Sequence, residues 1–556
     1  MAVEKKIEAE ILTKALIKQQ SISKPGEAEY RIEETKLAEQ INKWFEEKNV
    51  PSFLQELPDG RKNVFAFVAG KRDETIVIAG HFDTVDVKDY LRMKLHPFDS
   101  DTLAEEQEID TERYVVGRGA FDMKSGIAVG MTLMNKWNEN KDNLNGSVLF
   151  VATCDEENDS FGILNAADVL LAAKGSAIDD GKLTNQVKKL TGGRELNLQG
   201  VINMDYTTER FPGDKEYHVW SGTIGKLLPS IIVRGKETHV GEHFGGFHAS
   251  SLMSRIVSEF EGNMEFAGNS VPPTVLKLSD GRDLYNVMTE STLRAYVNVF
   301  SVGQTPAEII DKLKDKVTQV VGDYSESIKN NYGIYKNRMG LPNEVEIPDW
   351  GKRTKVMTYS ELLGLANEKI GKSEVDNLIK KIASTVQGDG RDVSFAIVDA
   401  LLTSSELKDP AVIIFYSPPY YPYIKPDNGK LYEATKAKSD EVGKEYGVSI
   451  TMHHFYPYIS DMSYLKLEPE ISSSINKLTG EMPVWGVENE NGKKVYHVDL
   501  DKVAKLGLPV VNVGPYGHGA HKTEERVEKK YSFEILPDLV DRIVNNIFND
   551  DKTPSL

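Results

Sequence analysis

Short apolar segments that alternate with helical patterns are the feature that most restricts how this chain can fold. Residues 1–50 have the periodicity of two amphipathic helices, with Ile7, Ile11 and Leu16 at helical spacing in the first. The segments NVFAFVAG, TIVIAGHFDTV, SVLFVATCDEE and GVINMDY then follow, and they are rich in valine, isoleucine and phenylalanine. Such runs are typical of buried strands in a sheet that helices cover. The alternation therefore predicts an α/β layer structure.

The pattern changes near residue 213, where segments such as KLLPSIIVRG and STLRAYVNVFSV are typical of antiparallel strands. Helices are predicted at 248–262 and 306–327, and three further helices within residues 330–408. The α/β pattern then resumes in the last part of the chain. One organisation explains this order, namely an α/β domain that an α+β domain interrupts. The predicted boundaries are 1–212 and 425–556 for the two parts of the α/β domain, and 213–424 for the inserted domain with 330–408 as its helical insertion.

Charge and cysteine content exclude several classes of protein. The chain of 556 residues has 67 Lys and Arg against 85 Asp and Glu, a net charge of −18. This balance argues against nucleic acid and anionic membrane surfaces as partners. A single cysteine, Cys154, excludes an intrachain disulfide framework and a multi-cysteine metal cluster. We find no secretory signal and no apolar run long enough to span a bilayer, so the expected location is the cytoplasm.

Potential metal ligands follow the apolar segments directly at five places. Taken singly, each fits a structural role, such as a turn, a helix N-cap or an acidic surface loop. Taken together, they supply two histidines and at least three carboxylates, a set that suits a pair of zinc-like ions. The five places are His81 with Asp83, Asp122, Asp155 to Glu157, Asp205 and His521.

At two of these places neighbouring residues can have different chemical roles. On an extended segment His81 and Asp83 point the same way, so the carboxylate can accept the second imidazole N–H while the other nitrogen binds metal. In the run Asp155-Glu156-Glu157, adjacent carboxylates repel one another unless cations compensate them. One glutamate would then bind metal, and its neighbour would act as general base on a water molecule.

In chain order, these motifs resemble those of the large metallopeptidase family that includes carboxypeptidase G, aminoacylase, tripeptidase and succinyl-diaminopimelate desuccinylase. The matching segments are His81-x-Asp83, GAFDMKSG from Gly119, Asp155-Glu-Glu and Gly514-Pro with Ala520-His521. The resemblance implies a zinc-peptidase-like α/β catalytic domain with a central, mostly parallel sheet and an inserted lid domain that commonly makes a dimer contact. It also implies two divalent metal ions, with zinc expected and cobalt or manganese as alternatives.

The resemblance assigns a role to each matching residue. Asp122 would bridge both metals, His81 and Asp205 would complete one site, and Glu157 and His521 would complete the other. Glu156 would be the general base, and Asp83 would orient His81.

The predicted lid offers further matches to the same family. The segment Gly235-Lys-Glu-Thr-His239-Val-Gly241 resembles the lid segment whose histidine stabilises an oxyanion. Asn286 resembles a lid asparagine that contacts substrate. The sequence then departs from the family pattern, because MTESTLRAYVNVF places Arg294 away from the position expected for an arginine that binds the substrate carboxylate. The sequence therefore does not identify the residue that binds the substrate carboxylate.

The resemblance implies metal-dependent hydrolysis of an amide-type C–N bond, either N-acyl, N-carbamoyl or peptide, in a small amino-acid derivative. The length, the lid insertion and the segment SDMSY at Ser460 resemble an arginine-utilisation group, which points to arginine or ornithine catabolism. The alternatives are a cytosolic dipeptidase or aminopeptidase of the same family, and a non-catalytic binding protein on this fold. The expected partners are a small molecule or short peptide and a second copy of the chain through the lid.

Overall fold

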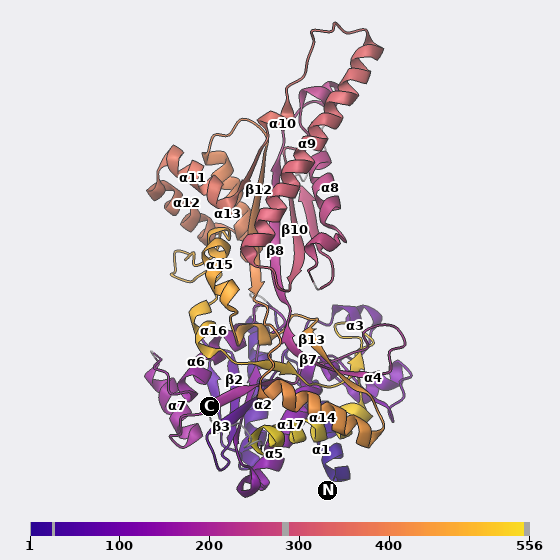
Figure 1. Ribbon diagram of the computed structural model, residues 1–556, viewed down its shortest axis with the longest axis vertical. Helices are drawn as coiled ribbons and strands as arrows, with labels where there is room; N and C mark the ends of the chain where they lie inside the picture. The colour runs from indigo at the N-terminus through magenta and orange to yellow at the C-terminus, as the bar shows by residue number, and fades with distance from the viewer. Residues whose placement is uncertain (1, 25–27, 179, 269, 281–287, 550–556) are drawn as a thin grey trace. The chain divides into compact units, whose positions relative to one another are not determined.

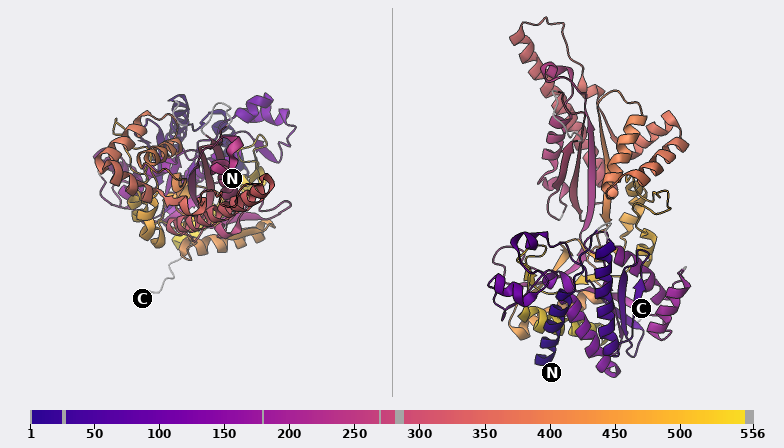
Figure 2. Two further views of the ribbon diagram at one scale, coloured as in Figure 1. Left: turned by 90° about the horizontal axis from the view of Figure 1, so that it is seen from above. Right: turned by 180° about the vertical axis from the view of Figure 1, so that it is seen from behind.

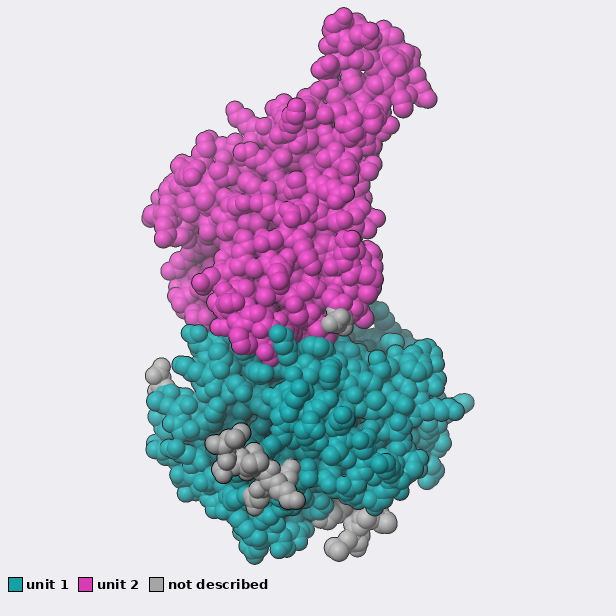
Figure 3. Space-filling model, in the orientation of Figure 1, with its two compact units in different colours: residues 1–223, 424–467, 499–556 teal, residues 224–423, 468–498 magenta. Residues whose placement is uncertain are grey.

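The computed structural model describes residues 2–24, 28–178, 180–268, 270–280 and 288–549. The chain divides into two compact units, which Figure 3 shows in teal and magenta. The first unit consists of Met1–Thr223, Ile424–Leu467 and Asp499–Leu556, and the second of Ile224–Tyr423 and Glu468–Val498.

A mixed sheet of eight strands forms the centre of the first unit (Figure 1). In spatial order the strands are β1 (Ser52–Glu56), β2 (Lys62–Val68), β5 (Ser147–Thr153), β3 (Glu74–His81), β6 (Asn197–Asn203), β14 (Val510–Asn512), β7 (Tyr217–Thr223) and β13 (Ile450–Tyr456). Strands β5, β3, β6 and β14 are parallel neighbours, as are β7 and β13. The other neighbouring pairs are antiparallel. The predicted α/β fold with a mostly parallel central sheet is confirmed.

Helices cover the middle of this sheet, which explains why a central strand such as β5 is largely apolar. All seven residues of β5 are buried, because a strand with helices on its faces exposes neither side to water. The terminal helix α17 contributes Leu539, Val540, Ile543 and Val544, whose spacing forms one apolar stripe. Figure 2 shows the N-terminal helices α1 and α2 in indigo, of which α2 packs on β2 and α1 on α5. The helices of this unit are α1 (Ala2–Lys18), α2 (Ala28–Glu47), α3 (Lys88–Met93), α4 (Ser100–Glu106), α5 (Ser125–Glu139), α6 (Phe161–Ala173), α7 (Gly181–Thr191), α14 (Lys430–Tyr446), α16 (Leu500–Leu506) and α17 (Leu536–Asn549).

A small antiparallel sheet brings distant parts of the first unit together. It consists of β15 (Gly517–His518), β16 (Arg526–Glu528) and β4 (Tyr114–Val116), in that order. Strand β4 leads into the loop that carries Asp122, and the connection between β15 and β16 carries His521. Pairing of β16 with β4 therefore sets these two loops side by side.

The second unit is an α+β domain built on a five-stranded sheet. Its strands, in spatial order, are β11 (Lys355–Thr358), β12 (Ala411–Tyr421), β8 (Gly225–Arg234), β10 (Thr292–Ser301) and β9 (Thr274–Asp280). Only the β11/β12 pair is parallel among them. The helices are α8 (Ala249–Phe260), α9 (Pro306–Met339), α10 (Trp350–Arg353), α11 (Tyr359–Ile370), α12 (Lys372–Thr385), α13 (Gly390–Ser404) and α15 (Pro469–Gly480).

The division into units differs from the predicted boundaries at two places. Strand β7 lies within the predicted insertion 213–424 but pairs with β14 and β13 of the first sheet. Residues 468–498, predicted in the catalytic domain, belong to the second unit, where α15 packs on α9. The Glu481 carboxylate there accepts hydrogen bonds from the backbone N–H and hydroxyl of Ser360, at 2.9 and 2.7 Å. Both differences arise from non-local hydrogen bonds, which local sequence patterns do not report.

Helix α9 is longer than the predicted 306–327. A capping box of Thr305 and Glu308 fixes its start, and Gly340 ends it in the left-handed conformation with φ of 62°. The three helices predicted within 330–408 are present as α11, α12 and α13. Among the helices that the structure describes, none has both the length and the apolar character needed to cross a membrane.

Candidate metal centre

The carboxyl ends of three neighbouring strands carry predicted site residues. His81 is the last residue of β3, the run from Asp155 to Glu157 follows β5, and Asp205 follows β6. Because β5, β3 and β6 are adjacent and parallel, their carboxyl ends meet at one edge of the sheet. Ligand sites of α/β proteins form at such edges.

Asp122 is the residue that joins the separate parts of the site. It lies in the tight turn Ala120–Lys124 before α5, in an extended conformation that directs its carboxylate away from the helix. One oxygen, Oδ1, lies 3.1 Å from His81 Nε2, and Oδ2 lies 3.1 Å from His521 Nε2. The side chain therefore does not cap α5, the structural role that the sequence left open for it.

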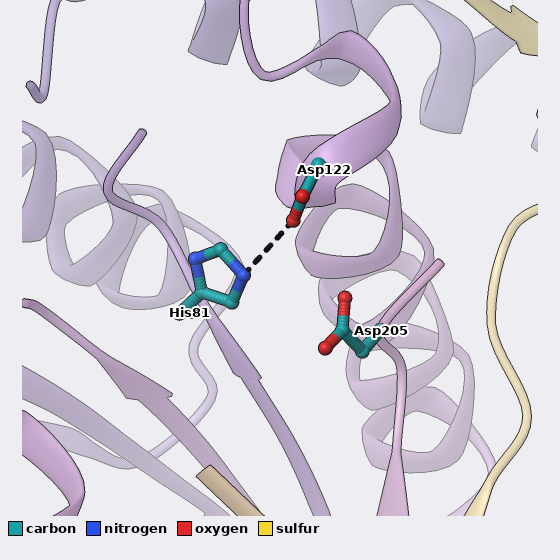
Figure 4. Close-up of side chains that lie close together, drawn as sticks. All are labelled: His81, Asp122 and Asp205. Atoms are coloured by element: carbon teal, nitrogen blue, oxygen red, sulfur yellow. Dashed lines mark hydrogen bonds and ion pairs between the residues drawn. The ribbon is translucent and has the colours of Figure 1, made fainter. Parts of the chain in front are cut away.

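Two groups of potential ligands share this carboxylate. His81, Asp122 and Asp205 form the first, and Asp122, Glu157 and His521 form the second. Within each group the ligand atoms all lie within 4.8 Å of one another. Figure 4 shows the His81 ring and the carboxylates of Asp122 and Asp205 facing a common space. Imidazole nitrogens and carboxylate oxygens are donors that zinc, cobalt and manganese accept, so these residues fit two divalent cations with Asp122 between them.

The electrostatics of the cluster also fit bound cations. Burial and the neighbouring Asp122 carboxylate raise the pKa of Asp205 to about 8, and they raise the pKa of Glu157 as well. Burial favours neutral His521, but its hydrogen bonds with Asp122 and Glu157 raise the imidazole pKa to about 11. Protons thus compensate the buried negative charge here. Divalent cations would replace those protons.

Glu156 lies beside the two groups and is itself buried. Its Oε2 lies 3.8 Å from His81 Nε2. Burial raises the pKa of Glu156 well above its usual range, opposed by His81 and reinforced by the carboxylates of Asp461 and Glu157. A carboxyl group with a raised pKa is a stronger proton acceptor than an exposed one, which suits a general base.

Asp83 contacts both His81 and the acidic turn. Its Oδ1 lies 3.5 Å from His81 Nδ1, and its backbone oxygen lies closer, at 3.2 Å. The carboxylate also accepts the backbone N–H groups of Glu156 and Glu157, at 3.0 and 3.1 Å. Asp83 therefore holds the backbone that presents Glu156, a contact between distant segments that the sequence does not predict.

A buried ion pair that local sequence patterns do not reveal supports Asp122. Glu525 accepts the backbone N–H groups of Phe121 and Asp122 at 3.2 and 3.3 Å, and its other oxygen lies 2.6 Å from Arg118 Nη1. Both Glu525 and Arg118 are 1% exposed. The sequence HKTEER gave one signal, a glutamate four residues after His521, but nothing in it distinguishes buried Glu525 from exposed Glu524.

The segment SDMSY lies against the same strand end. Asp461 is buried, and its Oδ2 accepts a hydrogen bond of 2.8 Å from the hydroxyl of Thr153, the last residue of β5. Burial raises the pKa of Asp461 to about 7. The Asp461 carboxylate also acts on Glu156, so this segment borders the ligand groups.

His239 belongs to the second unit and has an exposed side chain. Its Nδ1 accepts the N–H of Gly241 at 3.1 Å, so a neutral His239 ring carries its proton on Nε2. That N–H is the donor an oxyanion would need. Asn286 lies outside the described residues.

The first unit is an α/β domain that an α+β unit interrupts, and it carries histidine and carboxylate ligands at one edge of its sheet. This combination of fold and site is that of a metal-dependent hydrolase. The chain belongs to peptidase family M20/M25/M40, whose sequence pattern matches residues 77–546. The family resemblance inferred from the motifs is confirmed.

Individual relatives agree with this membership. Protein RocB of Bacillus subtilis (strain 168) is 30% identical over 526 residues, which cover 89% of this chain and 87% of that protein. Succinyl-diaminopimelate desuccinylase of Hydrogenovibrio crunogenus is 24% identical over 293 residues, which cover 52% of this chain and 68% of the enzyme.

Solved structures agree on the fold. A tripeptidase from Staphylococcus aureus superposes with a TM-score of 0.53 at 14% identity, covering 98% of each chain. The di-peptidase Dug1p of Saccharomyces cerevisiae gives a TM-score of 0.52 at 10% identity, covering 100% of this chain and 98% of that one.

Proposed function

We propose that this protein hydrolyses an amide-type C–N bond, either N-acyl, N-carbamoyl or peptide, in a small amino-acid derivative. One observation supports the proposal most strongly, namely that Asp122 is shared by two ligand groups beside buried Glu156. Membership of the peptidase family agrees with it.

Two divalent cations would be held by these residues. Asp122 would bridge them, His81 and Asp205 would complete one site, and Glu157 and His521 the other. We propose zinc, with cobalt or manganese as alternatives, because this donor set accepts all three. When bound, the cations supply Lewis-acid polarisation of the scissile carbonyl and lower the pKa of water.

The remaining steps belong to side chains of this protein. Glu156 takes a proton from the attacking water on its carboxylate and returns it to the leaving nitrogen. Asp83 holds His81 and the backbone of Glu156 in place while this occurs. His239 donates its Nε2–H to the oxyanion, which requires the second unit to act as a lid.

For the substrate class we propose a derivative of ornithine or arginine. The support is the resemblance of the SDMSY segment and of the inserted architecture to an arginine-utilisation group, together with the similarity to RocB over most of both chains. A cytoplasmic location and a homodimer formed through the second unit belong to the same proposal.

Amine release tests the proposal directly. The zinc-loaded protein is incubated with citrulline, N-acetylornithine, N-acetylarginine and simple dipeptides, with and without a chelator. We expect chelator-sensitive release from an ornithine or arginine derivative. If only dipeptides are hydrolysed, the proposed mechanism stands, but the protein is a dipeptidase and the proposed substrate class is wrong. Protein that binds no metal and turns over nothing would favour a binding protein on this fold.

A substitution of the general base separates chemistry from metal binding. Glu156→Gln removes the proton acceptor but keeps the size of the side chain, so we expect turnover to fall about 10²–10⁴-fold. Metal content should stay at the wild-type level, because Glu156 is not among the proposed ligands. The matched control is Glu105→Gln, at an exposed position of α4, which should leave turnover unchanged. Unchanged turnover in Glu156→Gln would contradict the assignment of the base.

A further inference from the structure

A cavity of about 640 Å³ opens beside Glu157 and His521, within the first unit. Its wall includes four cationic side chains, Lys24, Lys88, Arg92 and Arg118, and two carboxylates besides Glu157, namely Asp86 and Asp89. The protein as a whole carries a net charge of −18. On this wall four cations face three carboxylates, Asp86, Asp89 and Glu157, which reverses the acidic balance of the whole chain beside the proposed metal ligands.

The two wall carboxylates already have cationic partners. Lys88 Nζ lies 2.9 Å from Asp86 Oδ2, and Arg118 Nη2 lies 3.2 Å from Asp89 Oδ2. Arg118 is 1% exposed and is also paired with buried Glu525, so it forms a fixed part of the wall. These pairs hold the wall in place without using all of its positive charge.

These pairs leave two wall cations, of which Lys24 lies over the Tyr30 ring with its Nζ 5.1 Å from the centroid, and the other is Arg92. It lies in the last turn of α3, and among the described residues no carboxylate pairs with its guanidinium. Arg294, the arginine that the sequence analysis weighed as a clamp for the substrate carboxylate, is different, because it forms an ion pair with Asp399. A guanidinium presents a planar fork of donors that fits a carboxylate with two hydrogen bonds.

We propose that this cavity binds a carboxylate group of the substrate, with Arg92 as its principal donor. The inference rests on the proposed function, since it assigns one end of the amide substrate to this wall. A substrate whose carbonyl lies at the ligand groups reaches the cavity directly, because Glu157 and His521 belong to both. A carboxylate site at this wall restricts the proposed substrates to amides that carry a free carboxylate group.

A comparison of two charge-removing variants tests the role of Arg92. Arg92→Gln removes the guanidinium from the cavity. The matched control Lys94→Gln removes the same charge two residues away, at an exposed position that does not line the cavity. Both are assayed with N-acetylornithine and with its α-carboxamide. We expect Arg92→Gln to raise KM for the acid at least tenfold with kcat within twofold, and to leave KM for the amide unchanged. Lys94→Gln should change neither value by more than twofold.

A binding measurement distinguishes failure of this inference from failure of the proposed function. Succinate is titrated by calorimetry into the metal-loaded wild-type protein and both variants. If Arg92→Gln alone loses at least tenfold in affinity for succinate, the carboxylate site is supported. If that loss is observed but no amide is hydrolysed by the wild-type protein, only the proposed function is overturned. Equal succinate affinity in all three proteins overturns the carboxylate site. An equal rise in the KM of Arg92→Gln for N-acetylornithine and for its α-carboxamide overturns it as well.

Discussion

Gly514→Ala is the substitution whose effect on the metal centre can be worked out most directly from the structure. Gly514 follows β14, and Asp205 follows the adjacent parallel strand β6. A Cβ at residue 514 would lie 1.8 Å from the backbone oxygen of Asp205, whereas such contacts essentially never fall below 3.0 Å. The two strand ends must therefore separate by about 1.2 Å.

This displacement is large compared with what a metal site accepts. Ligand distances in metal sites are held within about 0.2 Å, and Asp205 is one of the proposed ligands. Changes in residues that support a ligand typically weaken metal binding about 10- to 100-fold. We expect one of the two ions to bind weaker by this factor, or about 1.4–2.7 kcal/mol, while the other keeps its wild-type affinity. Overpacking should also lower the stability of the first unit by about 1–3 kcal/mol.

Competition with a chromophoric chelator measures the affinity of each ion, and urea unfolding measures stability. The matched control is Gly181→Ala at the start of α7, where an added Cβ meets no atom within 4 Å. That variant should bind both ions normally and be equal or slightly higher in stability. If Gly514→Ala binds both ions with affinities within twofold of wild type, the reasoning from strand-end packing is refuted.

Two further predictions concern the charges around the ligands. Glu525→Gln leaves Arg118 without its buried counterion, so at pH 8 urea unfolding should show a loss of about 3 kcal/mol. The exposed neighbour Glu524→Gln should show no loss, and equal stability of the two variants would contradict the assigned pairing. At pH 7, metal binding should release roughly three protons per chain, because without cations the pKa values of His521 and Asp205 are about 11 and 8, and the pKa of His81 is raised well above its usual range. Titration calorimetry in buffers of different ionisation enthalpy measures this release, and no dependence on the buffer would contradict the proposed ligand set.

The apolar strands and the polar residues at their ends can be predicted from the sequence, because both are local properties of the chain. The interior of a buried parallel strand is apolar, so a polar side chain at its carboxyl end stands out in the sequence, as His81 does at the end of β3. The length of α9 was underestimated because the predicted end at residue 327 lies within a helix that continues to Met339. Its stop signal, Gly340, is local and could have been used.

Contacts between distant segments could not be predicted in the same way. Glu525 and Glu524 are chemically identical in the sequence, and only the fold buries one of them beneath the Asp122 turn. The assignment of β7 to the first sheet and of residues 468–498 to the second unit also depends on partners far along the chain. Arg92 has no distinguishing motif, and it stands out only because Lys88 and Arg118 form ion pairs and Lys24 lies over the Tyr30 ring.

The sequence by itself predicted the α/β class, the interruption of one unit by another, and the potential metal ligands that the structure brings close together. These follow from hydrophobic periodicity and from the kinds of side chain placed at strand ends, which are short-range properties. The tertiary structure alone decided that Asp83 holds the backbone of Glu156, that Glu525 supports the Asp122 turn, and that a cavity lined by Arg92 adjoins His521. The physical reason is that distances, burial and unbalanced charge depend on how the strands and loops pack in three dimensions.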